Sequence, residues 1–428
     1  MRVGYLVSVL GSALLAVLPA AAAEEDVIVA AEEPILVPSS QSEEILSYST
    51  QWVQQIEPAA PRGSDIQFHG YLNAGGLFND HGAGYNVVSV NSDNQIGLDG
   101  AYAWVSKEAR TGCGAVDWGF GVDALFGRDA RFLSSYAGFD SGMETGHRSD
   151  YINGWGLDYD NESYGFAFPQ VYGEMSVKDV VVKMGQFYTP LGYESARASE
   201  RFFYSFGRNE EVNPVSHTGV LATYKGINGI ELTGGWAMGE NNLFERGYGE
   251  SLIIGAVKFF NEDRTSLRYD ILTGDGVMQG LAGDLFRNDL VFETKIDSNW
   301  ETAFVVNYGK FTSDDGSASA FTGDITTYMA LSGLDAFQYE SLAGFLYYNL
   351  CPGWKLGTRT EWQRGWNGDN SHEWIDLGLG ANWAPVGGDN FLIRPEIRYD
   401  RAVVPIFGDA SDPTGDQLTV GFDVLCKI

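Results

Sequence analysis

The fold is indicated most directly by the stretch Val116-Asp-Trp-Gly-Phe-Gly-Val-Asp-Ala-Leu-Phe126. Its apolar residues recur at every second position, and the positions between them hold mostly glycine and aspartate. Alternate side chains of an extended strand point to opposite faces, so one face of this segment is apolar and the other is polar or tiny. The pattern predicts a strand whose two faces meet different surroundings.

The same alternation recurs in about sixteen segments of about ten residues each, from residue 65 to the end of the chain. Short turns and longer polar connections follow one another between the segments. The short turns are expected near Gly112, Lys178, 225–229, 261–263, 297–298, 351–353 and 387–388. The longer connections are expected at about 79–94, 127–165, 189–214, 239–250, 274–287, 312–335, 365–372 and 401–415.

A meander with short turns on one rim and long loops on the other is typical of outer-membrane barrels. We therefore predict an all-β fold at residues 63–428, a transmembrane antiparallel up-and-down β-barrel of about 16 strands, within roughly 14–18. A β-sandwich would also alternate. The charged or tiny inward residues and the regular sequence of connections favour the barrel. Two segments fit less well, because 251–260 has no clean alternation and the fourth segment contains Pro169.

Aromatic residues gather near the ends of the predicted strands, as in the aromatic girdles of membrane barrels. The rings expected near the short-turn rim are Trp104, Trp118, Trp300, Trp354 and Trp383.

The first 62 residues differ from the rest. Residues 1–23 have the features of a secretory signal peptide: Arg2, an apolar run at 5–18, and a small-residue cleavage site at Ala21-Ala-Ala23. Residues 24–62 form an N-terminal segment that is either a short periplasmic helix or a loose tether, because Ser40-x-x-Glu43 resembles a capping box. These features predict export to the cell outer membrane.

Composition excludes several classes of function. The formal net charge of −30 would repel the phosphates of nucleic acid, so we expect no nucleic-acid partner. The five histidines show no metal-ligand spacing, and no Gly-x-Ser-x-Gly motif is present. We therefore predict no catalytic residues, no metal site, no cofactor and no enzyme activity.

Five short motifs stand out along the chain, namely Phe68-His-Gly-Tyr71, Phe168-Pro-Gln-Val-Tyr172, Lys183-Met-Gly-Gln-Phe-Tyr-Thr-Pro-Leu-Gly-Tyr-Glu194, Phe202-Phe-Tyr-Ser205 and His217-Thr-Gly-Val-Leu-Ala-Thr-Tyr224. They resemble motifs of the OmpL-like family of outer-membrane β-barrel porins. The resemblance spans most of the chain from about Phe68. It implies a passive diffusion channel in a Gram-negative-type outer membrane.

The connection at 189–214 is the candidate site, because the equivalent loop of sixteen-stranded porins folds into the lumen. Its charged residues are Glu194, Arg197, Glu200, Arg201, Arg208, Glu210 and Glu211. The inward positions of later strands supply pore-wall candidates, namely Arg268, Arg359, Arg394 and Arg398. An acidic loop facing a basic wall would set an electric field across the lumen. These charges could equally be solvated surface groups or structural ion pairs, and the sequence leaves both alternatives open.

The sequence thus predicts an outer-membrane porin that passes small polar solutes or ions, with a constriction loop between the fifth and sixth strands. Its expected partners are the lipid bilayer and these solutes, together with two further copies in a homotrimer by analogy with general porins. The alternatives are a structural or ligand-binding barrel with a closed lumen, and an exported glycan-binding β-sandwich.

Overall fold

The computed structural model describes residues 66–81, 94–112, 116–134, 164–210, 212–244, 249–261, 264–278, 281–314, 336–367, 370–388, 390–405, 407 and 413–428. The predicted signal peptide at 1–23 and the segment 24–62 lie outside these residues. Across the described ranges, no helix has the length and apolar composition needed to cross a membrane. The helical elements within these residues are α2 (Ala130–Leu133) and the 3-10 turns η4 (Ala198–Glu200) and η5 (Arg208–Glu210).

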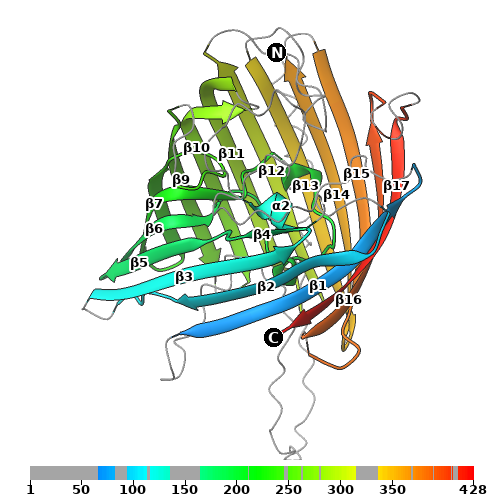
Figure 1. Cartoon of the computed structure of the whole chain (residues 1–428), viewed down its shortest axis with the longest axis horizontal. Coiled ribbons are helices and arrows are strands. Elements are labelled where there is room, and N and C mark those ends of the chain that lie inside the picture. Colours follow the sequence, from blue (N-terminus) through cyan, green and yellow to red (C-terminus); the bar gives the residue numbers. More distant parts are fainter. Residues whose placement is uncertain are drawn as a thin grey trace, which may run out of the picture. The chain divides into compact units, whose positions relative to one another are not determined.

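Seventeen strands in these ranges form one antiparallel sheet that closes on itself. The first strand pairs with the second and also with the last, where Ala74 lies opposite Val424. Figure 1 shows β1 (blue) beside β17 (red). Closure confirms the predicted barrel and shows that the β-sandwich alternative is wrong. The strands are β1 (Gln67–Asn79), β2 (Gly97–Lys107), β3 (Val116–Gly127), β4 (Gly165–Ala167), β5 (Val171–Val177), β6 (Val180–Tyr188), β7 (Ser216–Ile227), β8 (Ile230–Ala237), β9 (Ser251–Asn261), β10 (Thr265–Met278), β11 (Leu281–Lys295), β12 (Trp300–Ser313), β13 (Ala336–Cys351), β14 (Trp354–Asn367), β15 (Asn370–Trp383), β16 (Phe391–Ala402) and β17 (Asp416–Lys427).

The fourth strand position of the barrel wall is occupied by two short strands, β4 and β5, which both pair with β3. The break falls at Phe168-Pro169-Gln170, because proline has no N–H group to donate to the sheet. The Gln170 side chain instead donates to the Asp123 carboxylate at 3.2 Å. When β4 and β5 are counted as one interrupted strand, the described barrel has sixteen strands, as predicted.

Strand β3 alternates as its sequence predicts. Val116 and Trp118 face outward and are 63% and 58% exposed, whereas Asp123 and Leu125 face the interior and are buried. Strands β16 and β17 alternate in the same way. An apolar outer face is what a strand in contact with lipid requires.

Four of the five predicted girdle rings face outward, and Trp354 stacks on Trp383 with ring centroids 5.4 Å apart. Trp104 is the exception, because it stacks on His69 at 5.1 Å and packs against the interior rings Tyr71 and Tyr102. The register between β1 and β2 shifts between Asn73 and Ala74. Such a bulge reverses which alternate side chains face inward, and the sequence alternation alone does not reveal it.

Two of the predicted long connections are wrong. Strands β10 and β11 stay paired until Met278 lies opposite Leu281, and β14 and β15 until Asn367 lies opposite Asn370. Polar residues such as Asp275 made these segments look like loops. A hairpin that extends past the apolar band needs no apolar outer face, and Asp275 is exposed there.

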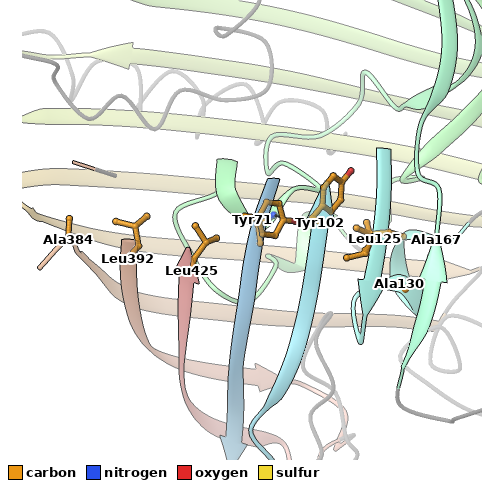
Figure 2. Close-up of a cluster of buried hydrophobic side chains, with 10 residues drawn as sticks. Tyr71, Tyr102, Leu125, Ala130, Ala167, Ala384, Leu392 and Leu425 are labelled. Carbon is orange, nitrogen blue, oxygen red and sulfur yellow. Dashed lines mark hydrogen bonds between the residues drawn. The ribbon is translucent and has the colours of Figure 1, made fainter. Parts of the chain in front are cut away.

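Apolar clusters occupy parts of the interior. In Figure 2, Tyr71, Tyr102, Leu392 and Leu425 rise from neighbouring strands toward the same side of the sheet. They pack against α2 and against Ala198 of the connection after β6. A second cluster places Leu252 and Ile254 of β9 next to Leu191. Strand β9 is therefore apolar on both faces over this length, which explains its lack of clean alternation.

Candidate functional site

The candidate site is the connection from β6 to β7, residues 189–215, which we call the 189–215 loop. Its two ends meet at a narrow neck, where the Thr189 N–H donates to the Val215 carbonyl at 3.0 Å. Between these ends, its described residues contact inward-facing side chains of the strands. The loop therefore lies inside the barrel.

The first turn of the loop is fixed by Gly192. Its N–H donates to Asp289 of β11 at 2.6 Å, and its carbonyl accepts from Arg268 of β10. Gly192 has a φ of +90°, and a Cβ atom there would overlap the Glu210 carboxyl group. Glycine is required at this position by both its backbone conformation and the close approach of Glu210.

All four predicted wall arginines face the interior, and each contacts the loop. Arg268, Arg359, Arg394 and Arg398 are 5%, 0%, 1% and 1% exposed. Arg359 pairs with Glu194 of the loop at 3.4 Å. The loop and the wall arginines that the sequence singled out therefore lie in contact with each other.

Arg394 and Arg398 hold the loop through its backbone. The Arg394 Nη1 group donates to the carbonyls of Ala198 and Arg201 at 2.7 and 2.8 Å. The Arg398 Nη1 group donates to the Phe206 carbonyl at 2.6 Å. Because charged donors form the stronger hydrogen bonds, these contacts tie the centre of the loop to β16.

The wall carries acidic as well as basic side chains, so it is not basic overall. Each of these arginines also has an acidic partner on the wall, placed two residues along or on a neighbouring strand. The pairs are Arg268–Asp270 at 2.6 Å, Arg359–Asp376 at 3.5 Å, Arg394–Asp423 at 2.8 Å and Arg398–Asp400 at 2.8 Å. The alternative that these charges are structural ion pairs describes the geometry better.

The loop acids are also engaged. Glu194 accepts the Gly207 N–H at 2.5 Å in addition to its contact with Arg359. Glu200 pairs with Arg197 at 3.0 Å and accepts the Ser195 hydroxyl at 2.7 Å. Glu211 lies outside the described residues.

Glu210 is a loop acid whose pKa is altered by its surroundings. It accepts the backbone N–H groups of Tyr193 and Glu194 at 2.6 and 3.0 Å. Burial, reinforced by the nearby Glu194 carboxylate, raises the pKa of Glu210 to about 8. Glu210 is therefore largely uncharged at neutral pH and contributes little negative charge there.

The loop arginines contact different parts of the wall. Arg197 pairs with Asp123 of β3 at 2.7 Å, and its guanidinium lies 4.5 Å from the centre of the Trp104 ring. Arg208 pairs with Asp400 of β16 at 3.4 Å.

Arg201 lies 3.8 Å over the Phe206 ring and is buried. Of the three loop arginines, Arg197 keeps the most contact with water, with 15% of its side chain exposed. The loop thus spans the lumen from β3 to β16.

Two buried pairs in the interior were missed from the sequence. Arg287 of β11 pairs with Glu240 of the connection after β8 at 2.6 Å, and Arg128 pairs with Asp99 of β2. Arg287 lies two residues before Asp289, at an inward position. The sequence had assigned Arg287 to the end of the predicted connection 274–287, so the alternation rule was not applied to it.

The fold and the family of the chain agree. A family model described as "Putative beta-barrel porin-2, OmpL-like" matches residues 65–428. A search of curated protein sequences finds no match.

Solved porins and outer-membrane channels share the fold, among them the following three. An anion-selective porin from Comamonas acidovorans is 12% identical with a TM-score of 0.54, over 85% of this chain and 99% of that chain. The trimer form of OmpT from Vibrio cholerae is 10% identical with a TM-score of 0.54, over 85% and 99%. The DcaP channel of Acinetobacter baumannii is 12% identical with a TM-score of 0.54, over 85% and 97%. Because the family model covers nearly all of the chain from residue 65 onward, the chain belongs to the OmpL-like beta-barrel porin-2 family and is an outer-membrane porin-type barrel.

Proposed function

We propose that this chain is a passive, water-filled diffusion channel for small polar solutes or ions, and that the 189–215 loop forms its constriction. The observation that carries the proposal is the attachment of the loop inside the barrel by Arg268, Arg359, Arg394 and Arg398. A loop held at so many points around the lumen limits the size of what can pass. No catalytic step is needed for this function.

Size exclusion would dominate the selectivity of such a channel. The loop and wall charges largely neutralise one another, and a neutral constriction exerts a weak field on a passing ion. The remaining electrostatic contribution would come from inward charges that touch water. Lys225 and Glu231 on β7 and β8 are such a pair, at 3.8 Å with side chains 28% and 15% exposed.

A second candidate function is a structural or ligand-binding barrel with a closed lumen. The burial of the loop charges favours it, because Glu194, Arg201 and Arg208 have almost no contact with water. A filter acts on a solute through groups that the solute can reach. The two candidates differ in whether the protein conducts.

We further propose that residues 1–23 are removed on export, that 24–62 stay in the periplasm, and that three copies assemble in the membrane. OmpT of Vibrio cholerae, a structural neighbour, is recorded in a trimer form. N-terminal sequencing of the membrane-extracted protein tests the removal of residues 1–23, and its native mass in detergent tests the assembly of three copies. An intact Met1 or a monomeric mass would contradict them.

Conductance of the purified protein in a planar bilayer tests the channel directly. Heat-modifiable gel mobility first establishes that the sample contains folded barrel. Stepwise current increases at constant voltage are the result expected for a channel. A folded sample that inserts without any current would instead support the closed-lumen barrel.

A further inference from the structure

The sequence motif Phe202-Phe-Tyr-Ser205 is the most deeply buried part of the 189–215 loop. Its four residues are 5%, 1%, 0% and 0% exposed. Loop residues are ordinarily solvent-exposed, so the burial of four consecutive residues indicates that they pack against a complementary surface of the barrel wall.

Three inward-facing glycines of β14 and β15 form a socket for the two phenylalanine rings. Gly357 and Gly380 lie directly opposite each other on these strands, and Gly378 is two residues along. A Cβ atom at Gly357 would overlap the Phe202 ring. A Cβ atom at Gly380 would come within 3.0 Å of the Phe203 ring, and one at Gly378 within 3.7 Å.

Backbone conformation does not explain these glycines. Glycine in a strand interior weakens the strand and often marks a close approach by another group. None of the three has the positive φ that would itself require glycine. The group that approaches closely is the Phe202–Phe203 pair.

The other half of the motif is held by polar contacts. The Tyr204 hydroxyl donates to Asp99 of β2 at 2.9 Å. The Ser205 N–H donates to Glu396 of β16 at 2.9 Å, and its carbonyl accepts from Arg359 of β14 at 3.0 Å. The motif therefore joins strands on both sides of the β17–β1 seam.

We propose that Phe202–Ser205, seated on the socket of Gly357, Gly378 and Gly380, is the positioning element that fixes the 189–215 loop and thereby sets the aperture. This inference rests on the proposed channel function only for its consequence for conductance. The fixing of the loop itself can be measured without any current.

The test replaces a socket glycine by leucine. Gly380→Leu places a side chain where the Phe203 ring lies. Gly344→Leu on β13 is the matched control, because a Cβ atom there points outward and meets only the Phe304 ring at an ordinary 3.7 Å. Folded barrels in detergent are treated with trypsin, and cleavage after Arg201 and Arg208 is mapped by mass spectrometry.

Gly380→Leu should be cleaved in the loop at least about tenfold faster than the unmodified protein, a factor that corresponds to 1.4 kcal/mol. Its conductance should rise, while Gly344→Leu behaves like the parent. Phe203→Ala, which creates no clash, should also expose the loop. Adding Phe203→Ala to Gly380→Leu should restore part of the protection, because leucine then fills the space of the ring.

Equal protection of the parent, Gly380→Leu and Phe203→Ala would overturn the positioning role. If Gly380→Leu fails the gel test for folding, Phe203→Ala alone decides. A parent protein that conducts no current contradicts the channel proposal, whereas the cleavage rates still decide the positioning role.

Discussion

Two parts of the inner wall, which we call arcs, carry similar charged residues but differ in how deeply these residues are buried. Along β10–β16, Arg359 and Arg398 are fully buried beneath the 189–215 loop and have acidic partners on the wall and polar groups on the loop. Along β5–β8, near the short turns, Glu174 and Lys183 are only half-buried, as is the pair Lys225–Glu231. The two arcs differ in burial because the 189–215 loop covers the first and not the second; their strand pattern and residue types are similar.

Because of this difference in burial, the charges of the first arc should matter for stability and those of the second for permeation. A buried charge depends on its partners, because removing one partner leaves the other unpaired in a low-dielectric site. An exposed pair contributes little to stability but remains within reach of a passing ion. Substitutions in the first arc should therefore impair assembly, and those in the second should change permeation.

Arg359→Gln should have the largest effect on stability. It removes the cation that Glu194 and Glu396 contact and leaves Asp376 with Arg398 alone, which should cost about 3–5 kcal/mol. The temperature at which the heat-modifiable band disappears measures the loss. The control is Lys225→Gln in the other arc, where the cost should stay below about 1 kcal/mol. Equal losses from both variants would remove the distinction between the arcs.

Adjacent residues of β8 test the orientation of the second arc. Leu232 faces outward, whereas Thr233 faces the interior and bonds Thr223. Leu232→Arg places a charge in lipid, which costs about 2–4 kcal/mol at the bilayer midplane and less toward the interfaces. Thr233→Arg projects into the lumen and should assemble normally. Equal yields of heat-modifiable barrel from the two variants would contradict this orientation.

The raised pKa of Glu210, in the loop that covers the β10–β16 arc, predicts that the stability of the protein depends on pH. Its pKa of about 8 in the folded protein lies above its ordinary value of 4.5, so the folded state retains a proton that the unfolded state has lost. Stability should therefore fall as pH rises through this window, by up to about 1.4 kcal/mol per pH unit.

Glu210→Gln cannot titrate and should remove this contribution while keeping an acceptor for the Tyr193 N–H. Unfolding in urea at pH 5, 6, 7 and 8 measures the slope. The same slope in the parent and the variant would show that Glu210 does not hold the proton.

Ion selectivity should show the smallest change, and only on substitution of the half-buried charges along β5–β8. Lys183→Gln combined with Lys225→Gln makes the local potential more negative, so permeation should shift toward cations. An exposed ion pair contributes about 0.2–1 kcal/mol to stability, and an effect of the same size on ion entry would change the permeability ratio about 1.4- to 5-fold.

Reversal potentials measured under a salt gradient give that ratio. The shift should shrink as salt rises, because the Debye length falls from about 10 Å at 0.1 M to about 3 Å at 1 M. Glu200→Gln, at a paired and buried group, should change the ratio less. A larger shift from Glu200→Gln would show that charges of the loop, rather than those along β5–β8, set the ion selectivity.

Strand alternation was sufficient to predict the barrel and the inward arginines, whereas the loop that they contact was chosen by analogy with sixteen-stranded porins. It failed where a local irregularity changed the pattern, as at Trp104 after the β1–β2 register shift. It also could not show that Arg394 would find Asp423 on the next strand, because cross-strand register is set by turns and bulges. The glycine socket was equally hidden, since a glycine in a strand gives no indication of which ring will lie on it.

The most direct test of the loop as a constriction is its removal. Thr189 and Val215 are already joined by a backbone hydrogen bond, so a short turn can replace the residues between them. The wall arginines keep their wall partners, such as Asp423 for Arg394, so the barrel should still assemble. The single-channel conductance of this shortened protein is then compared with that of the full chain. A clear increase is predicted, and an unchanged conductance from a folded barrel would contradict the loop as the constriction.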